Sequence, residues 1–358
     1  MDSKLPRDRA ALLAAVSSLR GIFTPYPRLD RIKSVITRLL SRGNAKSEGA
    51  VYTLVGETGA GKSHLLRLLE SEHPRVQGAR DLGNGDFADY VPVLLVKVPN
   101  ASVRLVAEAI FKALTGQPVS AVLGAKFKKE DVLTAILRAA SECDLKIMIL
   151  DEAHQSIDLK TDRVAQEVAV LLKDLANARI FSLLVVGTEG ALRLIRANAE
   201  LARRAHKTLR IEAFRRSAID LEIWYDILHD IDEVLENRVF GRKSNLDSPD
   251  MAEALMTAAN GFVGHMAALV ENAANEAVEE MLERDTEGCV RWEHLELAFS
   301  EWGPGEGRVN PFSPASRPPN KGSPLLPDCA EDTATPETVM SGVKGRGRRN
   351  DKDSLFRK

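Results

Sequence analysis

The stretch LVGETGAGKSHLLRLLE, at residues 54–70, restricts the possible fold more than any other part of the chain. It places three glycines and a lysine between an apolar run and a run with helical periodicity, although glycine weakens the interior of either element. Residues 56–63 match the pattern G-x-x-x-x-G-K-[ST] at every fixed position, between a predicted strand and a predicted helix. The pattern therefore predicts a phosphate-binding loop, with a plain glycine-rich turn as the alternative.

In such a loop the glycines let backbone N–H groups surround the β- and γ-phosphates of a nucleotide. Lys62 adds a positive charge, and the Ser63 hydroxyl can bind Mg²⁺. We therefore expect ATP and Mg²⁺ as ligands. The expected nucleotide-binding residues are Gly56, Glu57, Thr58, Gly59, Ala60, Gly61, Lys62, Ser63 and His64.

Polar residues also follow two later apolar runs. In IMILDE, Asp151 and Glu152 end a predicted buried strand, which places Asp151 beside the metal and Glu152 beside the attacking water as general base. An acidic pair at this point can also cap a helix. In VVGT, Thr188 ends the next strand, where it can reach the γ-phosphate or cap the helix that follows.

Strand and helix signals alternate as far as residue 213. The β-rich runs AVYTLVG, YVPVLLVKVP, LKIMILDE and FSLLVVGT are separated by helical segments. Nearly continuous apolar strands are typical of a parallel sheet that helices cover on both faces. We therefore predict an α/β nucleotide-binding domain at residues 44–213, with a helical segment at residues 1–43 packed on it.

Only helical periodicity is found after residue 213, which predicts a small all-α lid domain at residues 214–302. Residues 303–358 are rich in Pro, Gly and Ser, and their composition predicts a disordered tail with a basic end at residues 344–358.

Composition argues against several classes of protein. No apolar run approaches the ~18 residues of a membrane span. The net charge of −2 over 358 residues gives no overall preference for nucleic acid. Cys143, Cys289 and Cys329 are too widely spaced for a metal pair or a disulfide framework, as expected in a reducing cytoplasm.

The two motifs, the polar strand end and the helical lid together resemble AAA+ ATPases. The segments TPYPRLDRIKSVITRLL, LDEAHQ, VVGT and AELARRAHKTLRIEAF are similar to the TniB/TnsC family of AAA+ transposition regulators, and more distantly to MuB and IstB. The resemblance covers about residues 20–300. It implies a bacterial, cytoplasmic protein associated with the nucleoid, whose slow ATP hydrolysis depends on assembly.

The resemblance also implies residues beyond the two motifs. An arginine finger that completes a neighbouring subunit's site is expected in LARRAH, where the pattern favours Arg204 over Arg203; a solvated arginine pair is the alternative. In NGFVGHMAALVEN, His265 stands where many AAA+ proteins have the sensor-2 arginine. His265 is therefore expected either to contact phosphate or to lie on the lid surface.

Members of the family bind duplex DNA inside ATP-dependent filaments. The matching stretches PNASVRLVAEAI and GAKFKKEDVL offer Arg104, Lys126, Lys128 and Lys129, although a charge run can also be a solvated face. Because no base-reading module is evident, the expected contacts are to phosphates and independent of sequence. A transposase, a target-selection protein and further copies of the chain are the other implied partners, and the basic tail end is a candidate contact.

The implied function is a regulator that oligomerises on duplex DNA with ATP as a ring or helical filament, recruits a transposase and disassembles on hydrolysis. Two alternatives are another DNA-associated AAA+ ATPase, of the helicase-loader or initiator type, and a nucleotide-binding scaffold without turnover. The Pro/Gly-rich sequence after the lid argues against an initiator, and Glu152 argues against a scaffold.

Overall fold

The computed structural model describes residues 8–21, 26–41, 50–83, 85–99, 102–124, 126–156, 162–302 and 308–317. The expected domain boundary at residues 43 and 44 and the basic end at residues 344–358 lie outside these ranges. Among the helices of the described ranges, none combines the length and apolar character that a membrane span needs.

A parallel sheet with the strand order β4-β5-β6-β1-β7 forms the centre of the α/β part and confirms the predicted fold class. Its register pairs Val55 with Gly187 and Lys97 with Asp151, so the carboxyl ends of the strands share one edge. The strands are β1 (Val51–Val55), β4 (Val93–Lys97), β5 (Ile147–Asp151), β6 (Ser182–Gly187) and β7 (Leu209–Arg210).

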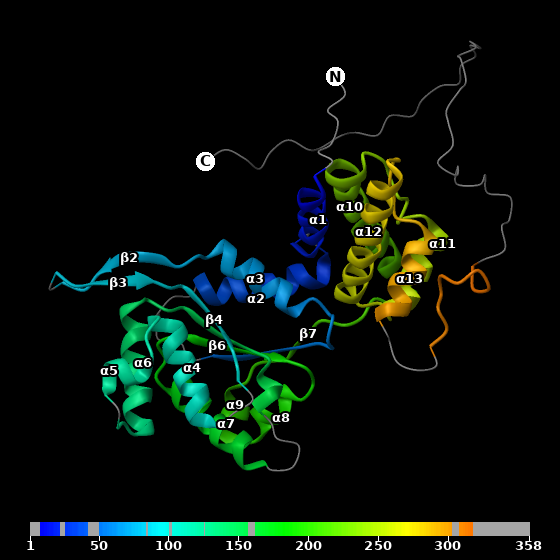
Figure 1. Ribbon diagram of the computed structural model, residues 1–358. Helices are drawn as coiled ribbons and strands as arrows, with labels where there is room; N and C mark the ends of the chain where they lie inside the picture. The colour runs from blue at the N-terminus through cyan, green and yellow to red at the C-terminus, as the bar shows by residue number, and fades with distance from the viewer. Residues whose placement is uncertain are drawn as a thin grey trace, which may run out of the picture. The chain divides into compact units, whose positions relative to one another are not determined.

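Both faces of the sheet are covered. Successive strand residues point to opposite sides of the sheet, and the residues on each side are buried in a different apolar cluster. On β5, Ile147 and Ile149 join one apolar cluster, whereas Met148 and Leu150 join the other. Helices α2 (Pro27–Ser41) and α3 (Lys62–Glu72) lie on the first side. The second side holds α4 (Val103–Thr115), α6 (Lys129–Glu142) and α7 (Asp162–Asn177) (Figure 1).

Shorter elements complete this part of the chain. They are α5 (Val119–Leu123), η2 (Ala153–Ser156), α8 (Ala191–Arg196) and α9 (Ala199–Arg204). The single helix expected after Thr188 is divided into α8 and α9. Asn198 is the N-cap of α9. Its side chain accepts hydrogen bonds from the N–H groups of Glu200 and Leu201, both at 3.0 Å, and a new helix therefore begins there.

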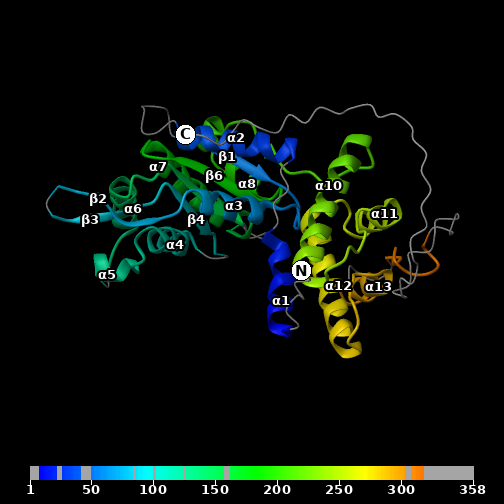
Figure 2. The same cartoon turned by 90° about the horizontal axis from the view of Figure 1, so that it is seen from above.

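An antiparallel ribbon of β2 (Val76–Asp81) and β3 (Phe87–Tyr90) was not predicted. It projects beyond the sheet in two perpendicular views (Figures 1 and 2). Most of its residues are exposed, and polar residues interrupt both strands, so they lack the continuous apolar run that marks the buried strands. Arg75 anchors its base by donating to the carbonyls of Ala113 and Leu114 at 2.7 and 2.9 Å.

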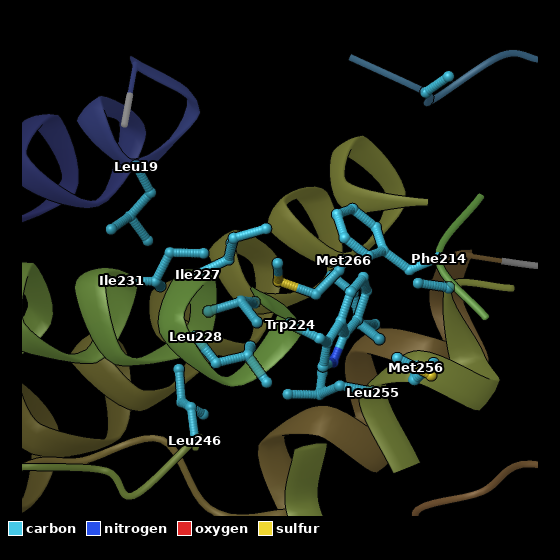
Figure 3. Packing of buried hydrophobic residues seen from close by; sticks show 14 of the residues in the cluster. Leu19, Phe214, Trp224, Ile227, Leu228, Ile231, Leu246, Leu255, Met256 and Met266 are labelled. Carbon is cyan, nitrogen blue, oxygen red and sulfur yellow. The ribbon is translucent and has the colours of Figure 1, made fainter. Parts of the chain in front are cut away.

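The second part of the chain is helical, as predicted. Its elements are α10 (Ala218–Leu235), η3 (Glu236–Phe240), α11 (Pro249–Ala258), α12 (Val263–Arg284) and α13 (Trp292–Trp302). Trp224 of α10 is fully buried in its core and donates from Nε1 to the carbonyl of Ala252 at 3.1 Å. Figure 3 shows Leu19, from the N-terminal segment, beside Ile227 and Ile231 of the same core.

The N-terminal segment differs from the expectation that all of it packs on the α/β core. Helix α1 (Arg9–Ser17), which continues into η1 (Ser18–Gly21), packs on α12 of the lid. Leu12 and Val16 are buried there, and the Arg9 guanidinium lies 2.6 Å from the Glu279 carboxylate. The apolar face of α1 thus completes the lid core, whereas α2 covers the sheet.

The packed chain also continues past Trp302, where we expected the tail to begin. Phe312 is fully buried, with ring centroids 6.0 Å from those of both Trp292 and Phe299. Arg317 lies 3.0 Å from the carboxylate of Glu293 on α13. One aromatic anchor therefore holds residues 308–317 on the lid, although the surrounding composition predicts disorder.

Candidate functional site

The loop between β1 and α3 has the shape that its glycines allow. Gly59 and Gly61 have φ angles of 77° and 94°, a region that other residues rarely adopt. A Cβ on Gly56 would lie 2.9 Å from the carbonyl oxygen of Ile211. The loop therefore brings bare backbone to the start of α3, where helix N–H groups and the helix dipole favour an anion.

Lys62 is the first residue of α3 and is almost fully buried. Its Nζ donates to the carbonyls of Gly56 and Glu57 at 2.7 and 2.9 Å. Burial lowers the pKa of Lys62, and the carboxylates of Glu152 and Asp151 act in the opposite direction. A buried cation inside an amide-lined loop fits a polyphosphate, which would supply the negative charge that the loop lacks.

Ser63 and Asp151 meet at the end of β5. The Ser63 hydroxyl lies 3.4 Å from Asp151 Oδ2, while Oδ1 accepts the N–H of Glu152 at 2.8 Å. Burial raises the pKa of Asp151, because a desolvated carboxylate loses its hydration. A hydroxyl and a buried carboxylate are hard oxygen donors that suit Mg²⁺, so these two side chains fit the expected metal.

Glu152 follows directly and faces the same space. Gln155 donates from Nε2 to Glu152 Oε2 at 3.1 Å, and His154 Nε2 lies 3.5 Å from that oxygen. His154 Nδ1 accepts the N–H of Thr188, at the end of β6, at 3.4 Å. The ends of β5 and β6 are therefore joined through one imidazole.

The lid contacts the phosphate loop directly. The N–H of Gly264, in the first turn of α12, donates to the carbonyl of Gly59 at 2.8 Å. A Cβ on Gly264 would lie 2.6 Å from that oxygen, and a Cβ on Gly59 would lie 2.3 Å from the ring of His265. Glycine is thus required on both sides of this contact.

A cavity of about 340 Å³ opens beside the loop and is walled by three parts of the chain. Of the predicted residues, it is lined by Thr58, Gly59, Ala60, Gly61, Lys62, Ser63, His64, Glu152 and Thr188. Gly56 and Glu57 shape the loop without lining the cavity. The apolar wall was not predicted and consists of Leu19, Tyr26, Leu29, Ile227, Ile231, Val263, Ala267 and Ala268.

This wall gave no separate sequence signal, because apolar residues at helical spacing are also typical of a core. Tyr26 shows that the wall is buried and apolar. Burial raises the pKa of Tyr26 to about 12, and its ring packs edge-on against Phe214 with 5.1 Å between centroids. A small apolar wall next to an anion-binding loop suits a flat base joined to phosphates.

His265 does not line the cavity. Its ring lies against Gly59 and stacks edge-on with Phe262 and Trp302, at 5.6 and 5.1 Å between centroids. Burial lowers the pKa of His265, which favours the neutral ring. The structure therefore places His265 as a packing residue between lid and loop.

Arg204 also lies outside the cavity, at the end of α9. Its Nη2 lies 3.6 Å from the Glu200 carboxylate, whereas its Nη1 is buried without a hydrogen-bond partner. Arg203 is exposed. Of these two arginines, Arg203 is therefore the more exposed, although the sequence pattern favours Arg204.

The expected DNA-binding residues gather in one place. Arg104, near the start of α4, lies over the ring of Phe127 with 4.5 Å from its guanidinium carbon to the ring centroid. Phe127 is flanked by Lys126 and Lys128, and these two lysines and Lys129 are exposed. Arg104 also pairs with Glu108 at 2.8 Å, so part of its charge is neutralised.

Comparisons with known proteins agree with this architecture. The family described as "Bacterial TniB protein" matches residues 18–214, which is more than half of the chain. Among the curated proteins compared with the chain, none matches.

Solved structures share the fold at low sequence identity, and two of them illustrate the likeness. Cdc6p from Pyrobaculum aerophilum is 14% identical, with 80% of this chain and 70% of that chain covered and a TM-score of 0.51. The ORC2 protein of Aeropyrum pernix, solved as ADPNP–ADP complexes, is 18% identical, with 80% and 71% covered and a TM-score of 0.51. With its phosphate loop, parallel sheet and helical lid, the chain has the fold of an AAA+ ATPase and belongs to the bacterial TniB protein family.

Proposed function

We propose that the chain is an ATP-hydrolysing regulator of DNA transposition that assembles on duplex DNA. The observation that carries the proposal is that Lys62, Ser63 and Glu152 line one cavity, which the lid and the N-terminal segment also wall, and that Asp151 lies 3.4 Å from the Ser63 hydroxyl. This set of side chains is the one that phosphoryl transfer from ATP to water requires.

Each residue has one task in hydrolysis. Lys62 and the loop amides hold the β- and γ-phosphates, and Ser63 with Asp151 would hold Mg²⁺, which neutralises charge on the phosphates. Glu152 accepts a proton from water as the water oxygen bonds to the γ-phosphorus and the bond to the bridging oxygen of ADP breaks. Thr188, which lines the cavity, would orient the water or the γ-phosphate.

Completion of the site by a second copy makes turnover depend on assembly. An arginine from α9 of the neighbour would stabilise charge on the transferred phosphoryl group. Arg203 and Arg204 are both candidates for this role. Arg203 is exposed, whereas Arg204 lies near the Glu200 carboxylate. ATP would thereby favour a ring or helical filament, and hydrolysis would release it.

Duplex DNA is the proposed template. The cluster of Arg104, Lys126, Lys128 and Lys129 around Phe127 supplies positive charge with no base-reading element, so its contacts would be to phosphates. Membership of the TniB family supports a transposase and a target-selection protein as further partners, in the cytoplasm of a bacterium and close to the nucleoid.

The test measures ATP hydrolysis with and without duplex DNA for the wild type and for Glu152→Gln. We expect slow turnover that DNA stimulates, a loss of at least about 100-fold in the variant, and retained assembly. Electron microscopy with DNA and a non-hydrolysable ATP analogue should show filaments, and Lys62→Ala should form none. A wild type that binds ATP but never hydrolyses it would instead identify a nucleotide-binding scaffold.

A further inference from the structure

Two polar residues that follow Glu152 in the chain hold its side chain. Gln155 Nε2 donates to Glu152 Oε2 at 3.1 Å, and His154 Nε2 lies 3.5 Å from the same oxygen. Within the part of the chain that the structure describes, no hydrogen bond reaches Oε1 of Glu152. One carboxylate oxygen is thus fixed while the other is left to take a proton, as a general base requires.

The backbone of the same turn is also held. Glu152 has a φ angle of 57°, in the left-handed region, which is strained for a residue other than glycine. Two hydrogen bonds keep it there. Asp151 Oδ1 accepts the N–H of Glu152 at 2.8 Å, and the carbonyl of Glu152 accepts the N–H of Gln155 at 2.8 Å. The turn thus holds Glu152 where its side chain lines the cavity.

The imidazole of His154 contacts the end of β6 on its other side. Nδ1 lies 3.4 Å from the N–H of Thr188. Since an amide N–H can only donate, Nδ1 is the acceptor, and the proton of the neutral ring lies on Nε2, toward Glu152.

The end of β6 is shaped around this ring. A Cβ on Gly187 would lie 2.9 Å from Nδ1, and a Cβ on Gly190 would lie 3.2 Å from the Cβ of His154. Two glycines thus leave the space that the imidazole occupies. The contact between His154 and the end of β6 is therefore part of the local fold and not a chance approach of two surface groups.

We infer that His154 and Gln155 are positioning residues for Glu152, and that His154 couples Glu152 to Thr188. The inference rests on the proposed ATPase function. A movement of the Thr188 backbone toward a γ-phosphate would carry the imidazole with it and turn the carboxylate that the imidazole contacts. These two residues then set the rate of hydrolysis, whereas nucleotide affinity is set by the loop at residues 56–63.

The experiment compares turnover and binding in the full-length chain with duplex DNA present. We expect His154→Ala and Gln155→Leu to lower kcat about 10- to 100-fold, the effect of misplacing a reacting group. The Kd for a fluorescent ATP analogue should stay within about twofold, since ground-state contacts are kept. His154→Gln keeps an N–H donor near Glu152 and should retain more turnover than His154→Ala.

A matched control removes another histidine–carboxylate contact. His229 Nδ1 lies 2.9 Å from Asp247 on the lid, and His229→Ala should change neither kcat nor Kd. A second readout uses Glu152→Gln as background. If His154 acts through Glu152, His154→Ala should cause no additional loss of turnover there.

The outcomes that would overturn the inference differ from the outcome that would overturn the proposed function. Unchanged kcat in both His154→Ala and Gln155→Leu would overturn the inference and leave the ATPase function standing. Parallel losses of kcat and ATP affinity in these variants would also overturn the inference. The same holds if His154→Ala lowers turnover as much in the Glu152→Gln background as in the wild type. A wild type without hydrolysis in the presence of ATP, Mg²⁺ and DNA would overturn the proposed function itself. Should His154→Ala fail to fold, the Gln155→Leu and His154→Gln pair gives the same decision.

Discussion

Gly59 is the residue at which the phosphate loop and the lid touch. Its carbonyl accepts a hydrogen bond from Gly264, and its Cα lies against the ring of His265. Phe262 and Trp302 enclose that ring, so it has little freedom to move away. A change at Gly59 therefore affects both the loop geometry and the position of the lid.

Gly59→Ala is expected to weaken nucleotide binding. The new Cβ would lie 2.3 Å from the His265 ring at a φ angle of 77°. Backbone strain of about 1–3 kcal/mol corresponds to about a 5- to 150-fold loss in affinity, which titration with a fluorescent ATP analogue measures. The control is Gly116→Ala, at the end of α4, where φ is 72° and no atom lies within 4 Å of the added Cβ. Equal affinity in Gly59→Ala and wild type would show that the lid contact is not needed for binding.

The two lid histidines His265 and His229 are expected to affect the pH dependence of stability in opposite directions. Burial lowers the pKa of His265, so the unfolded chain takes up a proton first as pH falls below the ordinary value of 6.5. The stability that His265 contributes is present above that pH and is lost as pH falls through its lowered pKa. His265→Gln should therefore flatten the decrease in melting temperature between about pH 7.5 and 5.5.

His229 is the internal comparison. The hydrogen bond to Asp247 raises the pKa of His229, so its contribution is complete below the ordinary value and is lost as pH rises through the raised pKa. His229→Gln should change the same melting curve in the opposite sense. Parallel curves for the two variants would contradict the assignment of His265 as a buried, neutral ring.

Elements with a strong apolar pattern could be predicted from sequence, and others could not. The strands that contain Leu54, Leu150 and Val186 are buried on both faces, so their apolar runs mark them. The β2–β3 ribbon is mostly exposed, and β7 has two residues, so neither carries such a run. The Gly-Asn-Gly-Asp run at residues 83–86 was the available signal for the ribbon.

The same contrast applies to the site. Lys62, Asp151 and Glu152 could be predicted because their chemistry requires fixed spacing from the strand ends. The cavity wall that includes Leu19 and Ile231 could not be predicted, because it is formed by helices far apart in sequence whose apolar residues also suit a core. Only the folded chain shows which apolar residues face the cavity.

The segment at residues 308–317 is expected to stabilise the lid. Phe312 is fully buried, so Phe312→Ala removes apolar contacts and leaves a cavity, at a cost of about 3–5 kcal/mol in the free energy of unfolding. Chemical denaturation monitored by circular dichroism measures this change. Val309 is 78% exposed, and Val309→Ala should alter stability by less than about 0.5 kcal/mol. A Phe312 variant as stable as the wild type would mean that this segment is not part of the lid.

At the scale of the whole molecule, the basic cluster and the cavity lie on different parts of the α/β domain. The cluster belongs to the start of α4 and the loop before α6, on the side of the sheet opposite to α2 and α3. None of its four cations lines the cavity. The four cations can therefore be replaced without a change in the residues that line the cavity, which allows the proposed DNA binding to be tested separately.

Replacing Lys126, Lys128 and Lys129 by alanine should weaken binding to duplex DNA and reduce its salt dependence. Each phosphate contact contributes about 0.9 to the slope of log K against log salt, so the slope should fall by up to about 2.7. Fluorescence anisotropy over a series of salt concentrations measures both effects. The same number of exposed cations removed from the lid, at Arg216, Arg238 and Lys243, is the control. An unchanged slope in the first variant would place the DNA on another face.

The three-part wall of the cavity has a consequence for the lifetime of the protein. A molecule that fills the cavity touches the N-terminal segment, the phosphate loop and the lid at once, so it fastens together stretches that are distant along the chain. At a hundred times its Kd, a ligand of the folded form alone adds about 2.7 kcal/mol to the free energy of unfolding. Starvation for adenine nucleotide would then leave these helices more open to proteases, and the abundance of the protein would follow the energy supply of the cell.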